Sequence, residues 1–123
     1  MNVTVQPMLL KGGITPPSSK SQAHRAVIAA ALAGGVSVLS NVAVSQDIQA
    51  TLDCMAAMGT GVERMGENVV HIRGLDRSLA QKRDGLPRFD CGESGSTLRF
   101  LIPVALAVAG GGVFTGRGRL MER

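Results

Sequence analysis

The chain has 123 residues, which leaves room for one domain with a modest core and excludes two complete domains. Its net charge of +4 favours anionic partners, but aromatic residues make up only 2%, so the stacking platforms of single-strand nucleic-acid binders are missing. Small anionic metabolites therefore fit the composition better than nucleic acid.

In the first part of the chain we expect short strands at 3–5 and 8–11, a stiff turn at 14–19, a helix at 20–33 and a strand at 36–39. A helix at 46–58 and a hairpin of strands 62–65 and 69–72 should follow. We expect a polar surface connection at 76–88 and a final helix over 94–109. Ser18 or Ser19 is expected to cap the first helix. Glycines directly follow each helix, as is typical of helix ends. These elements predict an α/β fold.

The cysteines and the apolar segments narrow the class of protein. Cys54 and Cys91 stand outside any C-x-x-C pair, so zinc-ligand spacing is absent and both are expected to be reduced, buried thiols. The chain starts without a basic stretch followed by an apolar one, and its longest apolar run is far below the roughly 20 residues of a membrane span. We expect a soluble, cytoplasmic protein.

An internal repeat is the most informative feature of the pattern. Arg25 aligns with Arg99, because each follows a Ser-rich loop and precedes an Ala-, Val- and Leu-rich helix that ends in glycines before a strand. The chain therefore holds about one and a half βαβαββ units, and the helices at 20–33 and 94–109 are expected to be equivalent, with related strand neighbours.

The first candidate site is the start of the 20–33 helix. Hydroxyls and free backbone N–H groups gather there with Lys20 and Arg25, and a helix N-terminus attracts anions. The two cations oppose the helix dipole unless a phosphate or carboxylate binds between them. A capped helix with solvated charges is the alternative interpretation.

Two further stretches repeat this chemistry. Residues 92–97 combine glycines, which let backbone approach a ligand, with the hydroxyls of Ser94, Ser96 and Thr97. Residues 116–123 hold three arginines, whose planar forks suit carboxylates and phosphates. A Gly-Ser turn and a solvated basic tail are the respective alternatives.

The residues exclude two well-known kinds of site. A Walker A loop needs Gly before Lys20, where Ser19 stands, and an S-x-x-K nucleophile needs Ser where Pro17 stands. His24 and His71 are isolated, so a structural role is expected for both. The sequence calls for no metal, nucleotide or other cofactor.

The three stretches together resemble the motifs of the EPSP synthase (3-phosphoshikimate 1-carboxyvinyltransferase) family. The first runs from Pro17 to Ala26, the second from Gly92 to Arg99 and the third from Gly116 to Arg123, in the family's order and spacing. The sister family of UDP-N-acetylglucosamine enolpyruvyl transferases has an Ala-Lys-Asn opening and a reactive Cys in the third loop, which this chain lacks.

The resemblance implies the inside-out α/β barrel of enolpyruvyl transferases. Residues 1–13 would be strands that join the other domain, and 14–123 would be a partial domain, with a first repeat at about 14–74 and the start of a second at about 88–123. Family members are much longer. The resemblance therefore implies a piece that is inactive alone, whereas the full-length enzyme would be monomeric. Because the helix at 94–109 is apolar on every face, we also expect the isolated chain to self-associate.

The implied reaction transfers the enolpyruvyl group of phosphoenolpyruvate to the 5-hydroxyl of shikimate 3-phosphate in aromatic amino-acid biosynthesis. The residue roles implied are Lys20 for both substrates, Ser21 and Arg25 for shikimate 3-phosphate, Gly95 and Arg123 for phosphoenolpyruvate, and Glu93, Ser94 and Arg99 in support. Glu93 departs from the family's frequent Asn, and Gln46-Asp47 replaces a commoner acidic pair. The alternative from another class is a non-catalytic module that binds small anions or a partner.

Overall fold

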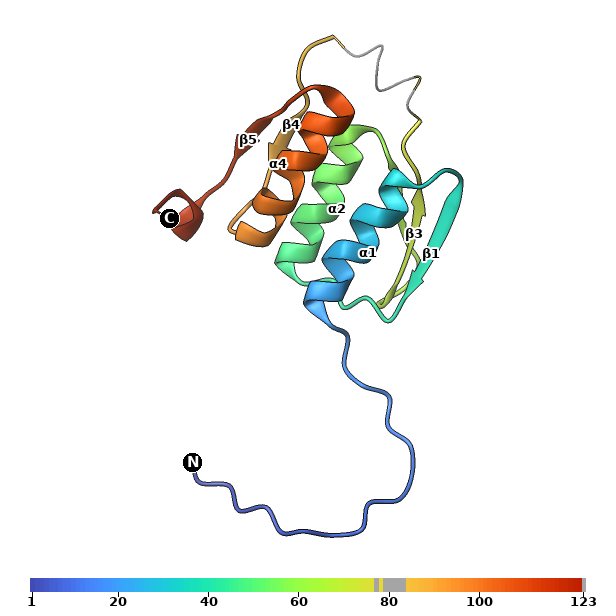
Figure 1. Cartoon of the computed structure of the whole chain (residues 1–123), viewed down its shortest axis with the longest axis vertical. Helices are drawn as coiled ribbons and strands as arrows, with labels where there is room; N and C mark the ends of the chain where they lie inside the picture. Colours follow the sequence, from blue (N-terminus) through green and yellow to red (C-terminus); the bar gives the residue numbers. More distant parts are fainter. Residues whose placement is uncertain (77, 79–83, 123) are drawn as a thin grey trace.

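A computed structural model describes residues 1–76, 78 and 84–122 of the chain. In chain order its elements are α1 (Lys20–Leu32), β1 (Val36–Ser40), α2 (Gln46–Met58), β2 (Gly61–Arg64), β3 (Val69–Arg73), β4 (Arg88–Asp90), α4 (Gly95–Ala109), β5 (Val113–Thr115) and the 3-10 helix η1 (Gly118–Glu122). Figure 1 shows α1, α2 and α4 side by side. The expected α/β fold is confirmed, while residues 77 and 79–83 of the expected surface connection at 76–88 lie outside the described residues.

The helix predictions are confirmed to within a residue or two, and capping explains their bounds. Ser19 is the N-cap of α1 and Ser45 that of α2, and each hydroxyl accepts a hydrogen bond from the backbone N–H three residues on. Gly59 ends α2 in the left-handed conformation with φ of 106°. Gly110 ends α4 in the same way, with φ of 71°.

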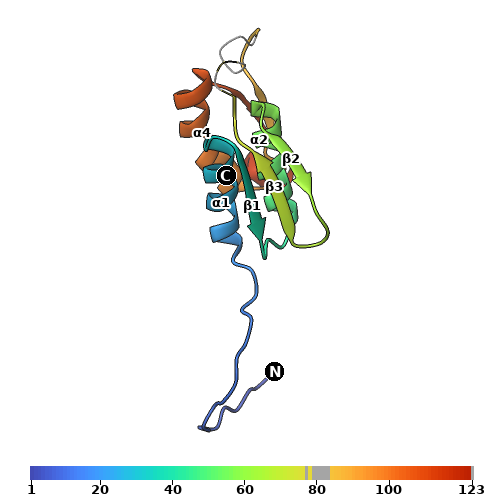
Figure 2. The ribbon, with the colours of Figure 1, turned by 90° about the vertical axis from the view of Figure 1, so that its right-hand side faces the viewer.

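The first sheet has the strand order β1-β3-β2, and both pairings are antiparallel. The expected hairpin is therefore confirmed as β2 and β3, which turn at Gly66 with φ of 78°. Val70 and Ile72 point into the core and are fully buried. The helices cover that face (Figure 2), while Val36 and Val38 on β1 remain exposed.

The core lies where α2 meets the other elements. Ile48, Leu52 and Met55 on α2 are at most 1% exposed. Both cysteines are buried and free, as expected, and burial raises the pKa of the Cys54 and Cys91 thiols. Helix α2 contacts α1, α4 and β4, so it joins the two halves of the chain.

The second sheet pairs β4 with β5 in parallel, with α4 as the connection between them. The Phe89 and Phe114 rings stack across this pair with centroids 4.9 Å apart. On α4, Leu101 and Ala105 are buried whereas Ile102 and Leu106 are exposed. None of the helices in the described ranges combines the length and apolar character that a bilayer crossing requires.

The N-terminal residues differ from expectation. Residues 1–13 form no strand and extend away from the body as an exposed arm (Figures 1 and 2). A strand needs a neighbour for its backbone N–H and C=O groups, and no element lies beside the arm. The first unit is therefore αβαββ and lacks its leading strand, and assignment of 1–13 to another domain stays a prediction.

The expected equivalence of α1 and α4 holds for the helices and fails for their strand neighbours. Both helices start at a Ser N-cap and lead into a strand after glycines. However, β5 pairs in parallel with β4, the strand before α4, whereas β1 pairs only with the antiparallel β3. The cause is the missing strand before α1, which leaves the outer edge of β1 open.

Gly74 makes the closest backbone approach in the first unit, and we predict that Gly74→Ala destabilises the chain. Its N–H donates to Gly35 O over 2.8 Å, and a Cβ atom there would collide with the Ala33 carbonyl oxygen. The expected loss is about 2 kcal/mol or more of the free energy of unfolding, measured by urea denaturation. Gly34→Ala is the matched control, because a Cβ there meets nothing within 4 Å; equal losses in both variants would contradict the prediction.

Candidate anion-binding site

Lys20 opens α1, and its charge is matched within the chain. Its ammonium group forms an ion pair with the Asp47 carboxylate, which lies in the first turn of α2. Asp47 suits that position because a negative charge stabilises a helix N-terminus, whereas Lys20 opposes the dipole of α1. The ion pair therefore offsets part of the unfavourable interaction between Lys20 and the dipole of α1, for which the sequence indicated a bound anion. It also ties the starts of the two helices together.

Arg25 is held between α1 and α4. Its Nη1 donates a 2.8 Å hydrogen bond to the Ser21 carbonyl oxygen, and its guanidinium carbon lies 5.3 Å from the centroid of the Phe100 ring. Ser21 is itself exposed, so its hydroxyl is accessible. The sequence did not indicate Phe100 as a contact of Arg25, because Phe100 lies among apolar residues that are typical of a buried helix.

The 92–97 loop is shaped by hydrogen bonds that leave the start of α4 open. Gly92 adopts φ of 56°, and its N–H donates to Asp90 Oδ1 over 2.9 Å. Ser94 is buried as the N-cap, and its Oγ accepts from Thr97 N over 3.2 Å. The backbone N–H groups of the first turn, which begins at Gly95, have no carbonyl partner within the helix and point toward the helix end.

A hollow of about 350 Å³ lies at this helix start. Its walls include Asp47, Glu93, Gly95, Ser96 and Arg99. Three residues expected at the site, Glu93, Gly95 and Arg99, are thus brought together. Asp47 joins them, and through its ion pair it connects the hollow to Lys20.

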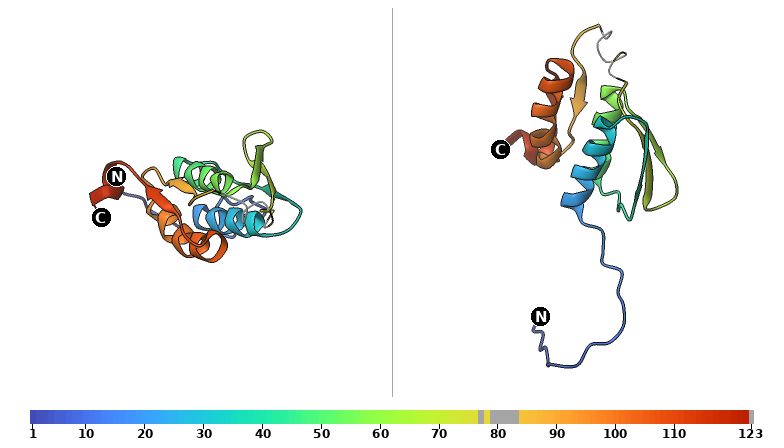
Figure 3. Two further views of the ribbon diagram at one scale, coloured as in Figure 1. Left: turned by 90° about the horizontal axis from the view of Figure 1, so that it is seen from above. Right: turned by 45° about the vertical axis from the view of Figure 1, so that its right-hand side comes forward.

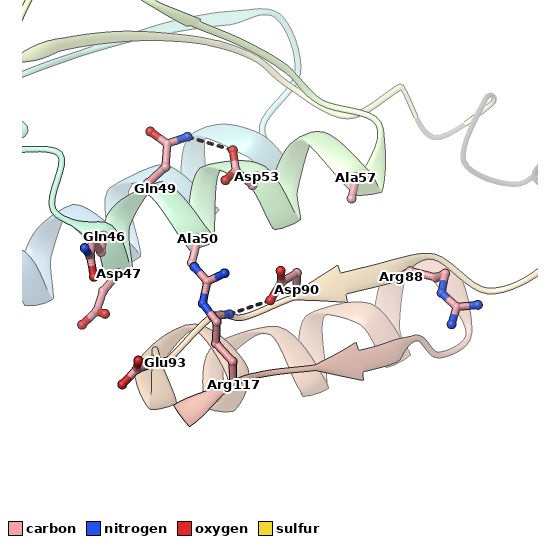
Figure 4. A pocket seen from close by; sticks show the side chains of 11 residues that line it. Gln46, Asp47, Gln49, Ala50, Asp53, Ala57, Arg88, Asp90, Glu93 and Arg117 are labelled. Carbon is pink, nitrogen blue, oxygen red and sulfur yellow. Dashed lines mark hydrogen bonds between the residues drawn. The ribbon is translucent and has the colours of Figure 1, made fainter. Parts of the chain in front are cut away.

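A second hollow, of about 400 Å³, continues from Asp47 and Glu93 along α2 (Figure 4). Figure 4 shows Asp53 and Gln49 on the α2 side and Asp90, Arg117 and Arg88 on the strand side. Among the described residues, no group of three or more His, Cys, Asp and Glu side chains is arranged to hold a metal ion.

The third motif lies directly against the second. Arg117 N donates to Gly92 O over 2.9 Å, and a Cβ atom on Gly118 would lie 2.6 Å from the Glu93 carboxyl carbon. Gly118 has φ of 55°, a left-handed conformation that favours glycine, while the Glu93 side chain could move to make room for a Cβ atom. The expected site residue Arg123, one residue past η1, lies outside the described residues.

His24 is part of a buried polar network. It is 1% exposed, and its Nδ1 lies 2.8 Å from Thr51 Oγ1, which lies 2.8 Å from Thr97 Oγ1. Thr97 Oγ1 donates in turn to Ser94 Oγ over 2.7 Å. Burial lowers the pKa of His24, Asp47 opposes this shift, and the charges of Lys20 and Arg25 add to it. The sequence placed His24 in a structural role and Thr97 among the exposed donors of the loop, and it gave no sign of Thr51 or of the network.

Comparison with known proteins decides the family. The model of the family "EPSP synthase (3-phosphoshikimate 1-carboxyvinyltransferase)" matches residues 5–123. The chain belongs to the EPSP synthase family. The 3-phosphoshikimate 1-carboxyvinyltransferases of Clostridium kluyveri and Clostridium botulinum (strain Eklund 17B) are each 42% identical to it, over 98% and 97% of this chain.

The fold agrees with that assignment. An EPSP synthase structure from Acinetobacter baumannii matches with a TM-score of 0.75 and 28% identity, covering 91% of this chain and 25% of that chain. The inside-out α/β fold expected from the sequence is thereby supported for the part present. The chain spans 27% and 28% of the lengths of the two clostridial relatives.

Within this EPSP synthase family member, the neutral form of His24 is the form that the fold favours. Because its pKa is lowered from 6.5, the unfolded chain binds more protons than the folded chain as the pH falls through 6.5. We predict that the free energy of unfolding decreases in that range, and that His24→Gln removes this component. Urea unfolding at pH 7.5, 6.5 and 5.5 measures it; a difference between wild type and variant that does not change with pH would refute it.

Glu93 places a carboxylate in the hollow beside Gly95, where it repels a bound anion. We predict that Glu93→Gln increases the affinity for inorganic phosphate roughly two- to fivefold, because two unit charges about 4 Å apart in water interact by about 1 kcal/mol. Isothermal titration at low and high salt measures the effect, which should shrink as salt screens the charge. Glu67→Gln, in the turn between β2 and β3, is the control, and an equal gain there would argue against a local effect.

Proposed function

We propose that this chain supplies the first part of the substrate site of a 3-phosphoshikimate 1-carboxyvinyltransferase. The observation that carries the proposal is the Lys20–Asp47 ion pair, which joins the start of α1 to a hollow lined by Gly95 and Arg99 at the start of α4. The N-termini of α1 and α4, each with a cationic side chain nearby, thus lie on either side of Asp47. Two substrates that each carry a phosphate and a carboxylate need such paired cationic sites.

The proposed roles follow the chemistry of each group. Lys20, at the junction, contacts both substrates, while Ser21 and Arg25 hold shikimate 3-phosphate. For phosphoenolpyruvate, Gly95 offers its backbone N–H and Arg123 its guanidinium fork. The supporting residues are Glu93, Ser94 and Arg99. When substrate enters, Lys20 exchanges part of its pairing with Asp47 for the anion.

In the proposed reaction the 5-hydroxyl oxygen of shikimate 3-phosphate bonds to the enolpyruvyl carbon that bears the phosphate, the hydroxyl loses its proton, and a proton adds to the neighbouring methylene carbon, which gives a tetrahedral intermediate. The C–O bond to phosphate then breaks and the new methyl group loses a proton, so that phosphate leaves and the double bond reforms. The cationic groups of this chain bind and orient the two anions and offset the repulsion between them. The groups that move protons are proposed to lie in the longer relatives, outside the part that this chain matches. We also propose that the protein works in the cytoplasm and that the chain alone is inactive.

A chimera tests the proposal directly. Replacing the matching segment of the Clostridium kluyveri relative by this chain should give an enzyme that releases phosphate from shikimate 3-phosphate and phosphoenolpyruvate. The chain by itself should release none. A folded chimera without turnover, or turnover by the chain alone, would contradict the proposal.

Variants of the chimera test the individual roles. We predict that Lys20→Ala or Arg25→Ala lowers kcat/KM at least ten- to a hundredfold, since a charge-assisted hydrogen bond contributes about 1.5–3 kcal/mol. Arg64→Ala, on β2 across the first sheet, is the matched control with kinetics expected to equal those of the parent. Near-normal kinetics for both site variants would remove Lys20 and Arg25 from the site.

A further inference from the structure

We propose that Thr51 and Thr97 are positioning residues whose hydroxyls fix the start of α1 relative to the start of α4. The inference rests on the proposed function, because it concerns the spacing of the same two anion-binding ends. Two side chains that touch no substrate would thus set the distance between the ends that bind the two anions.

The network joins one residue from each of the three packed helices. His24 comes from α1, Thr51 from α2 and Thr97 from α4, and the two links between them are both 2.8 Å long. All three side chains are at most 1% exposed. Figure 3 shows the three helices packed beside one another, and the two links place the hydroxyls between them.

Every member of the network is adjacent to a residue of the candidate site. His24 precedes Arg25, and the Ser94 hydroxyl that Thr97 contacts precedes Gly95. Both threonine hydroxyls also lie 3.2 Å from the carbonyl oxygen of Asp47, the residue that pairs with Lys20. A shift of any one helix therefore breaks a hydrogen bond and displaces a site residue together with it.

Apolar packing alone does not impose this precision. Valine would fill the volume of either threonine, and buried hydroxyls are costly unless they are hydrogen-bonded. Hydrogen bonds are directional, so a satisfied network selects one arrangement of helices that apolar contacts would let slide. Thr60 provides the contrast, since its buried hydroxyl has no hydrogen-bond partner among the described residues and it lies past the end of α2.

The imidazole sets the direction of the network. His24 Nε2 is buried and has no hydrogen-bond partner within the described part of the chain. A buried N–H without an acceptor is rarer in proteins than an unpaired acceptor. The favoured tautomer therefore carries its proton on Nδ1, which donates to Thr51 Oγ1. The Thr51 hydroxyl can then donate its own proton to the Asp47 carbonyl oxygen or to Thr97 Oγ1.

The test uses inorganic phosphate and NMR spectra of the whole chain. In wild type, inorganic phosphate should shift the backbone amides of Ser21 and Gly95, one at each anion-binding end. Thr51→Val and Thr97→Val should raise the Kd at each end about tenfold, the effect of one lost charge-assisted contact. Thr51→Ser and Thr97→Ser should restore the wild-type Kd values, and Thr60→Val should leave them unchanged.

The outcomes separate this inference from the proposed function. Phosphate binding by the valine variants that equals wild type overturns the positioning role and leaves the proposed function intact. Absence of phosphate binding by wild type overturns both. If a valine variant does not fold, the ¹⁵N shifts of His24 decide instead: a hydrogen-bonded Nδ1 in wild type and both serine variants supports the network, and shifts that show no hydrogen bond at Nδ1 overturn it.

Discussion

The site depends on the packing of α2 against both α1 and α4. Asp47 at the start of α2 pairs with Lys20, and Thr51 one turn later links His24 to Thr97. Without α2 the two helix starts of the candidate site would belong to separate units of the chain. The ion pair and the hydrogen bonds lie on the same side of α2. One face of this helix therefore both neutralises Lys20 and contacts the residues that link α1 to α4.

Close backbone contacts and charge act together in the second half of the site. The parallel pair of β4 and β5 brings Arg117 to the Gly92 loop, and Gly118 leaves room for the Glu93 carboxylate. A hollow that holds both carboxylates and arginines has a modest net potential. If the hollow binds anions, we expect such a mixed lining to select them by geometry more than by overall attraction.

Helices, the hairpin and the first two motifs were predictable because their signals are local. Ser caps, glycine stops and helical spacing specify α1, α2 and α4 within their own residues. The missing strand before β1 was not predictable, since strand formation depends on a partner. The Lys20–Asp47 pair and the cation–π contact of Arg25 with Phe100 depend on how helices pack, and residue spacing carries no record of that.

The order in which the elements occur in the chain has a consequence for synthesis on the ribosome. The pairs β1–β3 and β2–β3 join segments that emerge close together, so the first unit can form early. By contrast, β4 at Arg88–Asp90 finds its partner only when β5 at Val113–Thr115 has left the exit tunnel. The apolar side of α2 that later receives α4 is therefore exposed to solvent and chaperones during that interval, and we expect co-translational folding to proceed in two steps.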